Sequence, residues 1–208
     1  MTITKSQIAG MEKRYRTTLI NSLPGYKCLQ MVGTASAKGT TNLALFNSIF
    51  HVGANPALLG MVVRPNTPDH DTLDNIIATG CYTLNNVLPE WYQQAHQTSA
   101  SYPSGVSEFD TCGFQAYFND DFGAPFVAQS TVKIGLNLHE VLPIKINDTC
   151  IVIGEIHHLI VDPVMINEDG YIDHLKAGTV TVAGLDSYFT AQPLGRVAYA
   201  KPDNVKYN

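Results

Sequence analysis

The residue types best suited to chemistry in this sequence lie within one stretch, residues 34–85. A turn of small polar residues around Gly39 leads to Asn42 and Ser48, and Arg64 ends the apolar run that follows. Polar side chains and backbone amides of this kind can hydrogen-bond the edge of a flat heterocycle. An arginine adds a planar fork of donors that fits a phosphate. The stretch therefore predicts a pocket for an anion joined to a ring.

A short helix is expected soon after Arg64. An apolar stripe recurs at helical spacing, with a capping residue before it and a glycine after it. These residues are Asp71 or Thr72 at the cap, Leu73, Ile76 and Ile77 on the stripe, and Gly80 at the end. A helix N-terminus offers free N–H groups and the positive end of the dipole, which suit a phosphate. An ordinary capped helix, a solvated Arg64 and a plain turn fit the same spacing, so spacing alone leaves both interpretations open.

The elements around this stretch are mostly strands. An amphipathic helix is expected over residues 4–22, and after it come strands at residues 27–35, 45–52, 57–63, 131–138 and 150–161. Residues 57–63 are apolar throughout, which indicates burial on both faces, and residues 131–138 alternate as in a half-exposed antiparallel strand. Gly154 within the last strand predicts a bulge or a close backbone approach. Many strands without alternating long helices favour an antiparallel barrel over a doubly wound sheet.

Residues 86–126 break this pattern with proline, glycine, serine and many aromatic residues. One helix is expected around residues 89–99. A long irregular segment is often functional, as a lid or a substrate wall. Its aromatic residues suit three roles, which are to cover a bound ring, to pack a dimer interface or to fill the core.

Composition excludes several classes of protein. The chain has 208 residues, enough for one domain with a buried core, and a net charge of -5 without a basic run, which argues against nucleic-acid binding. No stretch reaches the length of a membrane span, and the N-terminus lacks the apolar region of a signal peptide. The widely spaced cysteines indicate neither a disulfide framework nor a zinc site. A cytoplasmic protein with no membrane contact is the expectation.

Motifs for other chemistry are missing. The sequence has no G-x-S-x-G elbow, Walker loop or G-x-G-x-x-G fingerprint, so hydrolase, phosphoryl-transfer and Rossmann dehydrogenase chemistry lack support. His157 and His158 are neighbours on an expected strand, so their side chains should point to opposite faces and not share a metal. No metal site is predicted.

The ordered set of motifs resembles the flavin-reductase-like, FMN-binding split-barrel family. The matching residues are Gly33-Thr34, Gly39, Asn42-Leu43-Ala44, Ser48, Pro56, Thr72, Asn75-Ile76, Thr79-Gly80 and Cys81-Tyr82-Thr83-Leu84-Asn85, followed by Glu108-Phe109, Cys112-Gly113-Phe114, Val152-Ile153-Gly154-Glu155, Asp173 and Leu194-Gly195-Arg196-Val197. The resemblance runs from about Leu23 to Tyr199. It implies a mainly β, antiparallel Greek-key split barrel with flanking helices, formed as a single domain by residues 1–208.

The resemblance also implies a function. Members bind FMN non-covalently at a homodimer interface, and many pass hydride from NADH or NADPH to the flavin for a partner enzyme or a small-molecule acceptor. By motif position the cofactor-binding residues are Thr34, Asn42, Ala44, Phe46, Asn47, Ser48, Arg64, Asp71, Thr72 and Asn85. Arg64 and Thr72 are expected at the phosphate. No catalytic side chain is singled out, because the flavin carries the electron chemistry. A flavoredoxin-like electron carrier without NAD(P)H activity is the alternative.

Overall fold

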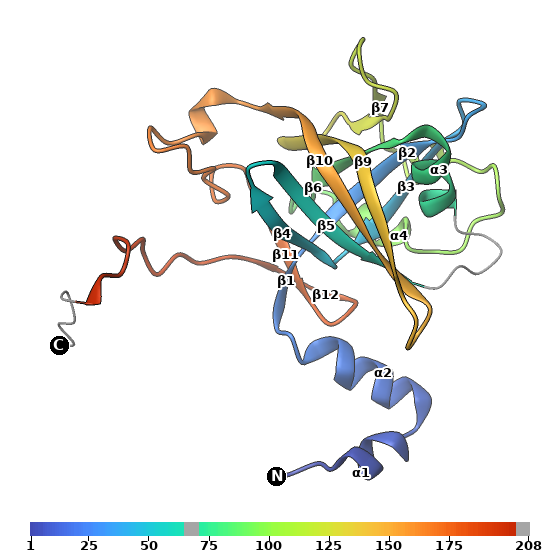
Figure 1. Cartoon of the computed structure of the whole chain (residues 1–208), viewed down its shortest axis with the longest axis vertical. Helices are drawn as coiled ribbons and strands as arrows, with labels where there is room; N and C mark the ends of the chain where they lie inside the picture. The colour runs from blue at the N-terminus through green and yellow to red at the C-terminus, as the bar shows by residue number, and fades with distance from the viewer. Residues whose placement is uncertain (65–70, 203–208) are drawn as a thin grey trace.

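The computed structural model describes residues 1–64 and 71–202 and is mainly β, as expected (Figure 1). Within these residues, seven strands form one antiparallel sheet in the order β3-β2-β6-β9-β10-β5-β4. Their bounds are Gln30–Ala35 (β2), Thr41–Phe46 (β3), Ile49–Ala54 (β4), Ala57–Val63 (β5), Cys81–Asn86 (β6), Val132–Ile144 (β9) and Thr149–Val161 (β10). The expected strand at residues 57–63 is confirmed.

The two edge strands of this sheet are consecutive in sequence. β3 lies at one edge and β4 at the other, yet only Asn47 and Ser48 join them. A link of two residues cannot span a flat sheet of seven strands, whose strands are about 4.8 Å apart. The sheet therefore curls until its edges meet at this link, which we call the seam. The predicted continuous strand over residues 45–52 is wrong, because the chain leaves one edge and enters the other at the seam.

The long hairpin of β9 and β10 lies in the middle of the main sheet. Its register shifts at Ile153 and Gly154, as the glycine predicted. A Cβ on Gly154 would collide with the hydroxyl of Tyr82, which is 1% exposed. The glycine therefore makes room for a large aromatic side chain inside the barrel.

A second register shift between Ile156 and His158 corrects the prediction for the histidine pair. The Nδ1 atoms of His157 and His158 lie 2.9 Å apart, and both rings contact Phe122. The two side chains therefore lie side by side instead of on opposite faces. An extra residue in a strand changes the direction of the side chains that follow it, and a strict period of two cannot anticipate that.

The N-terminal segment projects from the barrel (Figure 1). It contains α1 (Lys5–Ala9) and α2 (Lys13–Ser22) instead of the single helix expected over residues 4–22. Glu12 separates them, because its carboxylate accepts the N–H groups of Arg14 and Tyr15 at 2.8 Å and begins a new helix. Neither helix contains a buried residue.

A small sheet follows the N-terminal helices. Within the described residues it holds three strands, β1 (Tyr26–Cys28), β11 (Val180–Ala183) and β12 (Ser187–Thr190), in the order β1-β11-β12. It shares a hydrophobic core with the irregular segment, built around Leu29, Val87, Phe109, Phe114 and Val182. The first strand expected over residues 27–35 is thus divided between two sheets, with Leu29 at the division.

The irregular segment, residues 86–126, carries α4 (Tyr92–Gln97) and α5 (Glu108–Thr111), followed by the small hairpin of β7 (Ala116–Tyr117) and β8 (Phe126–Val127). A short 3-10 helix, η1 (Pro163–Met165), follows β10. The helix expected around residues 89–99 is present as α4, whereas α5 was not expected. Phe109 and Phe114 are buried, so for them the core role is correct. Among the described residues no helix combines the length and hydrophobicity that crossing a bilayer requires.

The predicted helix after Arg64 is α3 (Asp71–Thr79), and Gly80 follows it with a φ of 73°. Asp71 and Thr72 lie in the first turn and not at the cap, since the helix begins at Asp71. The residue before Asp71 lies outside the described part of the chain. α3 packs against the barrel through Thr72, Asn75 and Ile76, which are buried.

Candidate functional site

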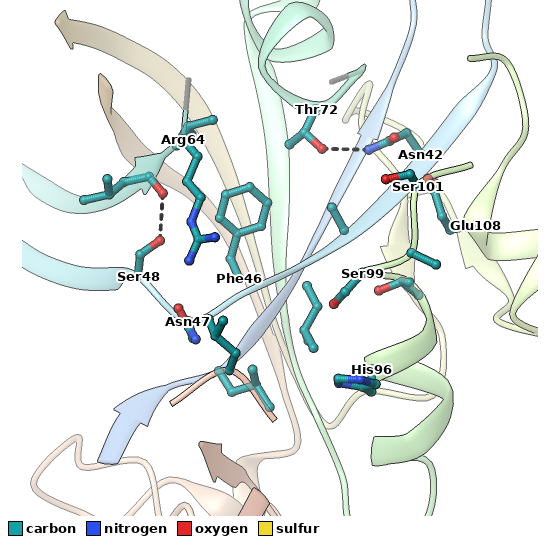
Figure 2. Close-up of a pocket in the computed structure, with 18 of the residues that line it drawn as sticks. Asn42, Phe46, Asn47, Ser48, Arg64, Thr72, His96, Ser99, Ser101 and Glu108 are labelled. Atoms are coloured by element: carbon teal, nitrogen blue, oxygen red, sulfur yellow. Dashed lines mark hydrogen bonds between the residues drawn. The ribbon is translucent and has the colours of Figure 1, made fainter. Parts of the chain in front are cut away.

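A cavity of about 770 Å³ lies beside the seam (Figure 2). Its walls come from β3, the seam, the end of β5, the start of α3, and the segment that follows α4. Asn21 from α2, Lys27 from β1 and Leu185 from the turn between β11 and β12 close one side. Residues distant in sequence meet here because the edges of the main sheet converge. The volume is in the range of pockets that hold small molecules and cofactors, about 300–1,000 Å³.

One end of the cavity is built to attract an anion. Arg64 lies at the end of β5 and donates from Nη2 to Asn21 Oδ1 at 3.2 Å. The first turn of α3 lines the same cavity through Asp71, Thr72 and Leu73. The first N–H groups of a helix have no partner within the helix. A guanidinium and a helix N-terminus therefore face one space, although the Asp71 carboxylate, which accepts from Ser104 Oγ at 3.3 Å, adds a negative charge nearby.

A buried polar network holds α3 against the sheet. Asn42 donates from Nδ2 to Thr72 Oγ1 at 3.0 Å and to Thr34 Oγ1 at 3.2 Å, and Asn75 donates to the same Thr34 oxygen at 3.2 Å. An amide N–H₂ can only donate, so the Thr72 hydroxyl accepts in this bond, and no acceptor for its own proton lies among residues 1–64 and 71–202. The network fixes the helix N-terminus relative to β3 and leaves Thr72 able to bind an anion.

The seam forms the next wall. Asn47 donates from Nδ2 to Gly184 O at 3.0 Å, and the Ser48 hydroxyl donates to Val62 O at 2.8 Å. Figure 2 shows Phe46, Asn47 and Ser48 on the side of the cavity that carries Arg64. Edge strands have backbone N–H and C=O groups that no neighbouring strand pairs. These side-chain bonds hold the chain where the two edges meet, and the Ser48 carbonyl accepts the N–H of Val62 at 3.3 Å.

The opposite wall comes from the irregular segment. It presents His96 from α4, small side chains from residues 98–101, and Glu108 from the start of α5 (Figure 2). Glu108 accepts the N–H of Leu43 at 2.9 Å, and burial raises the pKa of its carboxyl above the usual value despite this bond. His96 contacts Tyr188 of the small sheet at 2.6 Å. The expected role of this segment as a wall therefore fits its position.

The structure brings together eight of the ten predicted site residues. Those that line the cavity are Asn42, Ala44, Phe46, Asn47, Ser48, Arg64, Asp71 and Thr72. Thr34 and Asn85 do not, since both are 0% exposed. Thr34 lies behind Asn42 in the polar network, and Asn85 donates to Met31 O at 3.1 Å and accepts from Val127 N at 2.9 Å within the core.

Sequence reasoning missed several lining residues. Lys27, His96 and Leu185 lie outside residues 34–85, and folding brings them to the cavity. Lys27 donates from Nζ to Gly184 O at 2.9 Å, and burial, followed by the nearby Arg64, lowers its pKa. Glu108 belonged to a recognised motif, Glu108-Phe109, but that motif carried no indication of a place in the site.

Several solved structures are similar to this chain. A split-barrel protein from Shewanella frigidimarina NCIMB 400, assigned as a flavin reductase, is 44% identical, with a TM-score of 0.92 over 96% of this chain and 100% of that one. Nitrilotriacetate monooxygenase component B from Bacillus cereus is 17% identical (TM-score 0.82, 95% and 98% covered). Flavoredoxin of Desulfovibrio vulgaris (Miyazaki F) is 19% identical (TM-score 0.75, 96% and 98% covered). The last two show the fold alone.

The sequence itself places the chain in a family. The profile of the flavin reductase like domain matches residues 29–173, which include the seam, Arg64, α3 and Glu108. The match covers well over half of the chain, and the Shewanella protein shares the split-barrel fold across nearly all of it. The expected fold, an antiparallel split barrel with flanking helices, is therefore confirmed. This chain belongs to the flavin reductase like domain family and is a flavin-related oxidoreductase.

Proposed function

We propose that the chain, as a single flavin-reductase-like domain, binds FMN in the cavity beside the seam and acts as an NAD(P)H-dependent flavin reductase. One observation carries the proposal. A guanidinium, a helix N-terminus and the seam between the two edge strands line the same cavity of about 770 Å³. FMN needs an anion site at one end and hydrogen bonds along the edge of a flat ring at the other, and these groups supply both.

Each group has a distinct task in this proposal. Arg64, the Thr72 hydroxyl and the N–H groups of the first turn of α3 hold the phosphate. The backbone around Ser48 hydrogen-bonds the ring edge, and Phe46 packs against the ligand. When bound, FMN accepts a hydride from NADH or NADPH and passes the electrons on. The residues of the chain bind and orient the reactants and keep water away.

The electron acceptor distinguishes two versions of the function. The first is a reductase that supplies reduced flavin to a partner enzyme or reduces a small molecule directly. The second is an electron carrier without NAD(P)H activity of its own, which the fold shared with flavoredoxin also supports. Both need the same flavin pocket, so only turnover separates them.

We further propose that the protein is a homodimer. α2 has ten residues and no buried side chain. Isolated helices shorter than about 12–15 residues are marginal in water, so α2 needs a partner surface. Tyr15 and Leu23, 61% and 68% exposed, supply apolar contacts for a second copy of the chain. Light scattering after gel filtration should give twice the mass of one chain, and a monomer at micromolar concentration would exclude this proposal.

We also place the protein in the cytoplasm. All four cysteines are free. This suits a compartment that keeps thiols reduced.

A spectroscopic experiment tests the function. The purified protein is mixed with FMN, desalted, and titrated with NADH and then NADPH without oxygen. Retained flavin that bleaches, together with steady-state NAD(P)H oxidation when free flavin is in excess, supports the reductase. Retained flavin that stays oxidised favours the electron carrier. No flavin retained and no binding in a titration would refute both.

A further inference from the structure

His96 and Tyr188 form a pair at the wall of the cavity. His96 lies in the last turn of α4, and Tyr188 lies on β12, 92 positions later in the chain. The Nδ1 atom of His96 is 2.6 Å from the Tyr188 hydroxyl, and the two rings meet edge to face at 5.7 Å and 88°. Tyr92, one turn earlier in α4, also packs against Tyr188, with ring centroids 5.3 Å apart. The imidazole thus makes both a hydrogen bond and a ring contact with Tyr188, and Tyr92 packs on the same tyrosine.

The hydroxyl of Tyr188 decides where the proton of a neutral His96 lies. Burial, with a smaller contribution from Asp186, raises the pKa of Tyr188 to about 12, so its hydroxyl keeps its proton at neutral pH. A phenol is a better donor than acceptor, and an unprotonated imidazole nitrogen is a good acceptor. Tyr188 therefore donates to Nδ1, and the ring proton of His96 is on Nε2.

The Nε2 edge of His96 is open to a ligand. Among the described residues Nε2 has no hydrogen-bonding partner, and His96 is part of the cavity wall (Figure 2). The residues that follow it around the cavity, Ser99, Ala100 and Ser101, have small side chains. This wall therefore combines an oriented N–H donor with space beside it, opposite the seam where the proposed function places the flavin edge.

We propose that His96 donates a hydrogen bond from Nε2 to a carbonyl-type oxygen of a second planar ligand, and that Tyr188 is the residue that positions it. The inference rests on the proposed function, because the second ligand is the one that exchanges electrons with the flavin. Two ligands share this chemistry. One is the nicotinamide reductant, through its carboxamide oxygen, and the other is a carbonyl-bearing acceptor such as a quinone.

Three variants distinguish the role of His96 from the role of Tyr188. His96→Leu removes the donor, His96→Gln keeps an N–H donor on a side chain of similar reach, and Tyr188→Phe removes the hydroxyl that orients the ring. Tyr92→Phe is the matched control, since it deletes a hydroxyl from the same aromatic cluster without touching His96. All four proteins should bind FMN within twofold of the wild type, because neither His96 nor Tyr188 is assigned to the flavin.

Rapid-mixing experiments give the dissociation constant and the limiting rate for each ligand separately. Anaerobic reduction of the FMN-loaded protein by NADH reports the nicotinamide, and reoxidation of the reduced protein by 1,4-benzoquinone reports the acceptor. His96→Leu and Tyr188→Phe should each raise one or both dissociation constants about fivefold, the scale of one neutral hydrogen bond. His96→Gln should recover part of the loss, and Tyr92→Phe should behave as the wild type.

The two half-reactions also identify the ligand. A change confined to NADH assigns the oxygen to the nicotinamide, a change confined to the quinone assigns it to the acceptor, and a change in both indicates that the ligands use one subsite in turn. A readout independent of turnover is the 15N shift pattern of the His96 ring. It should report the Nε2–H tautomer in the wild type and a mixture in Tyr188→Phe.

Two results would overturn the inference. One is that His96→Leu and Tyr188→Phe leave both dissociation constants within twofold of the wild type while FMN still binds. The other is an Nδ1–H tautomer in the wild-type protein. A wild-type protein that fails to bind FMN would instead refute the proposed function, so the two failures are distinguishable.

Discussion

Replacing Arg64 by alanine tests where the phosphate of a bound flavin lies. Arg64 is exposed, and within the described residues its side chain makes a single hydrogen bond, to the neutral Asn21 at 3.2 Å. Within the part of the chain that the structure describes, Arg64 has no ion pair that must be broken before it can bind a ligand. A hydrogen bond to a charged group contributes about 1.5–3 kcal/mol, and the exposure of Arg64 favours the lower end. Since about 1.4 kcal/mol is tenfold in affinity, the dissociation constant of FMN should rise about 10- to 30-fold.

Riboflavin makes the measurement specific, because it has the same ring and no phosphate. Both flavins are titrated into the protein at one fixed salt concentration, with fluorescence quenching as the readout. Arg64→Ala should weaken FMN and leave riboflavin within twofold. Arg14→Ala, which removes one exposed positive charge from α2 away from the cavity, should change neither. If the affinity for FMN is unchanged, or if the affinity for riboflavin falls as much as the affinity for FMN, Arg64 does not bind the phosphate.

Three further predictions concern stability. Gly154→Ala should lower the free energy of unfolding in urea by about 1–3 kcal/mol, because the new Cβ collides with the Tyr82 hydroxyl, and Tyr82→Phe in the same protein should recover part of the loss. Glu108→Gln keeps an acceptor for the Leu43 N–H. Since burial raises the pKa of Glu108 in the folded state, its ionised form opposes folding. The variant should therefore have a higher melting temperature than the wild type at neutral pH, and this difference should disappear below the ordinary carboxyl pKa of 4.5. An equal difference in melting temperature at neutral pH and below pH 4.5 would contradict this. Asn86→Ala should cost about 3–5 kcal/mol in urea unfolding, because buried Asn86 accepts two backbone N–H groups at 2.9 and 3.0 Å, and a loss below 1 kcal/mol would show that water replaces it.

The sequence alone predicted an element correctly where one property of its own residues determines the structure. The apolar run at β5 has no polar side to expose, so its bounds, Ala57–Val63, follow from composition. α3 has a stripe, an acidic first turn and Gly80 in the left-handed conformation that its φ of 73° requires. Gly154 marks the bulge of β10 because a side chain does not fit there. Neighbours in sequence determine β5 and the end of α3, whereas Gly154 marks its position in the sequence although the side chain that requires it, Tyr82, is remote.

The predictions were wrong where residues distant in sequence determine the local structure. Nothing local separates β3 from β4, because Asn47 and Ser48 leave the strand to bond Gly184 and Val62, which are remote in sequence. The bulge that turns His157 and His158 to one side depends on the partner strand β9. A period of two or 3.6 describes one element alone, and both outcomes require a second one.

The difference between local and distant determinants also explains why the sequence predicted the position of the site but not all of its residues. Residues 42–48, 64 and 72 lie within one segment whose polar types depart from the strand pattern, so sequence alone gathered them. Their usefulness depends on the buried network of Asn42, Thr72 and Thr34, which fixes the N-terminus of α3 against β3. The side-chain N–H₂ groups of Asn42 and Asn75 donate to hydroxyl oxygens within the protein, so the network holds its position at little cost and resists rearrangement. Arg64, by contrast, is exposed on a long flexible stem. In the proposed function we therefore attribute two different roles to these groups. The buried network fixes the position of a bound anion, and the exposed Arg64 attracts the anion and contributes to its affinity.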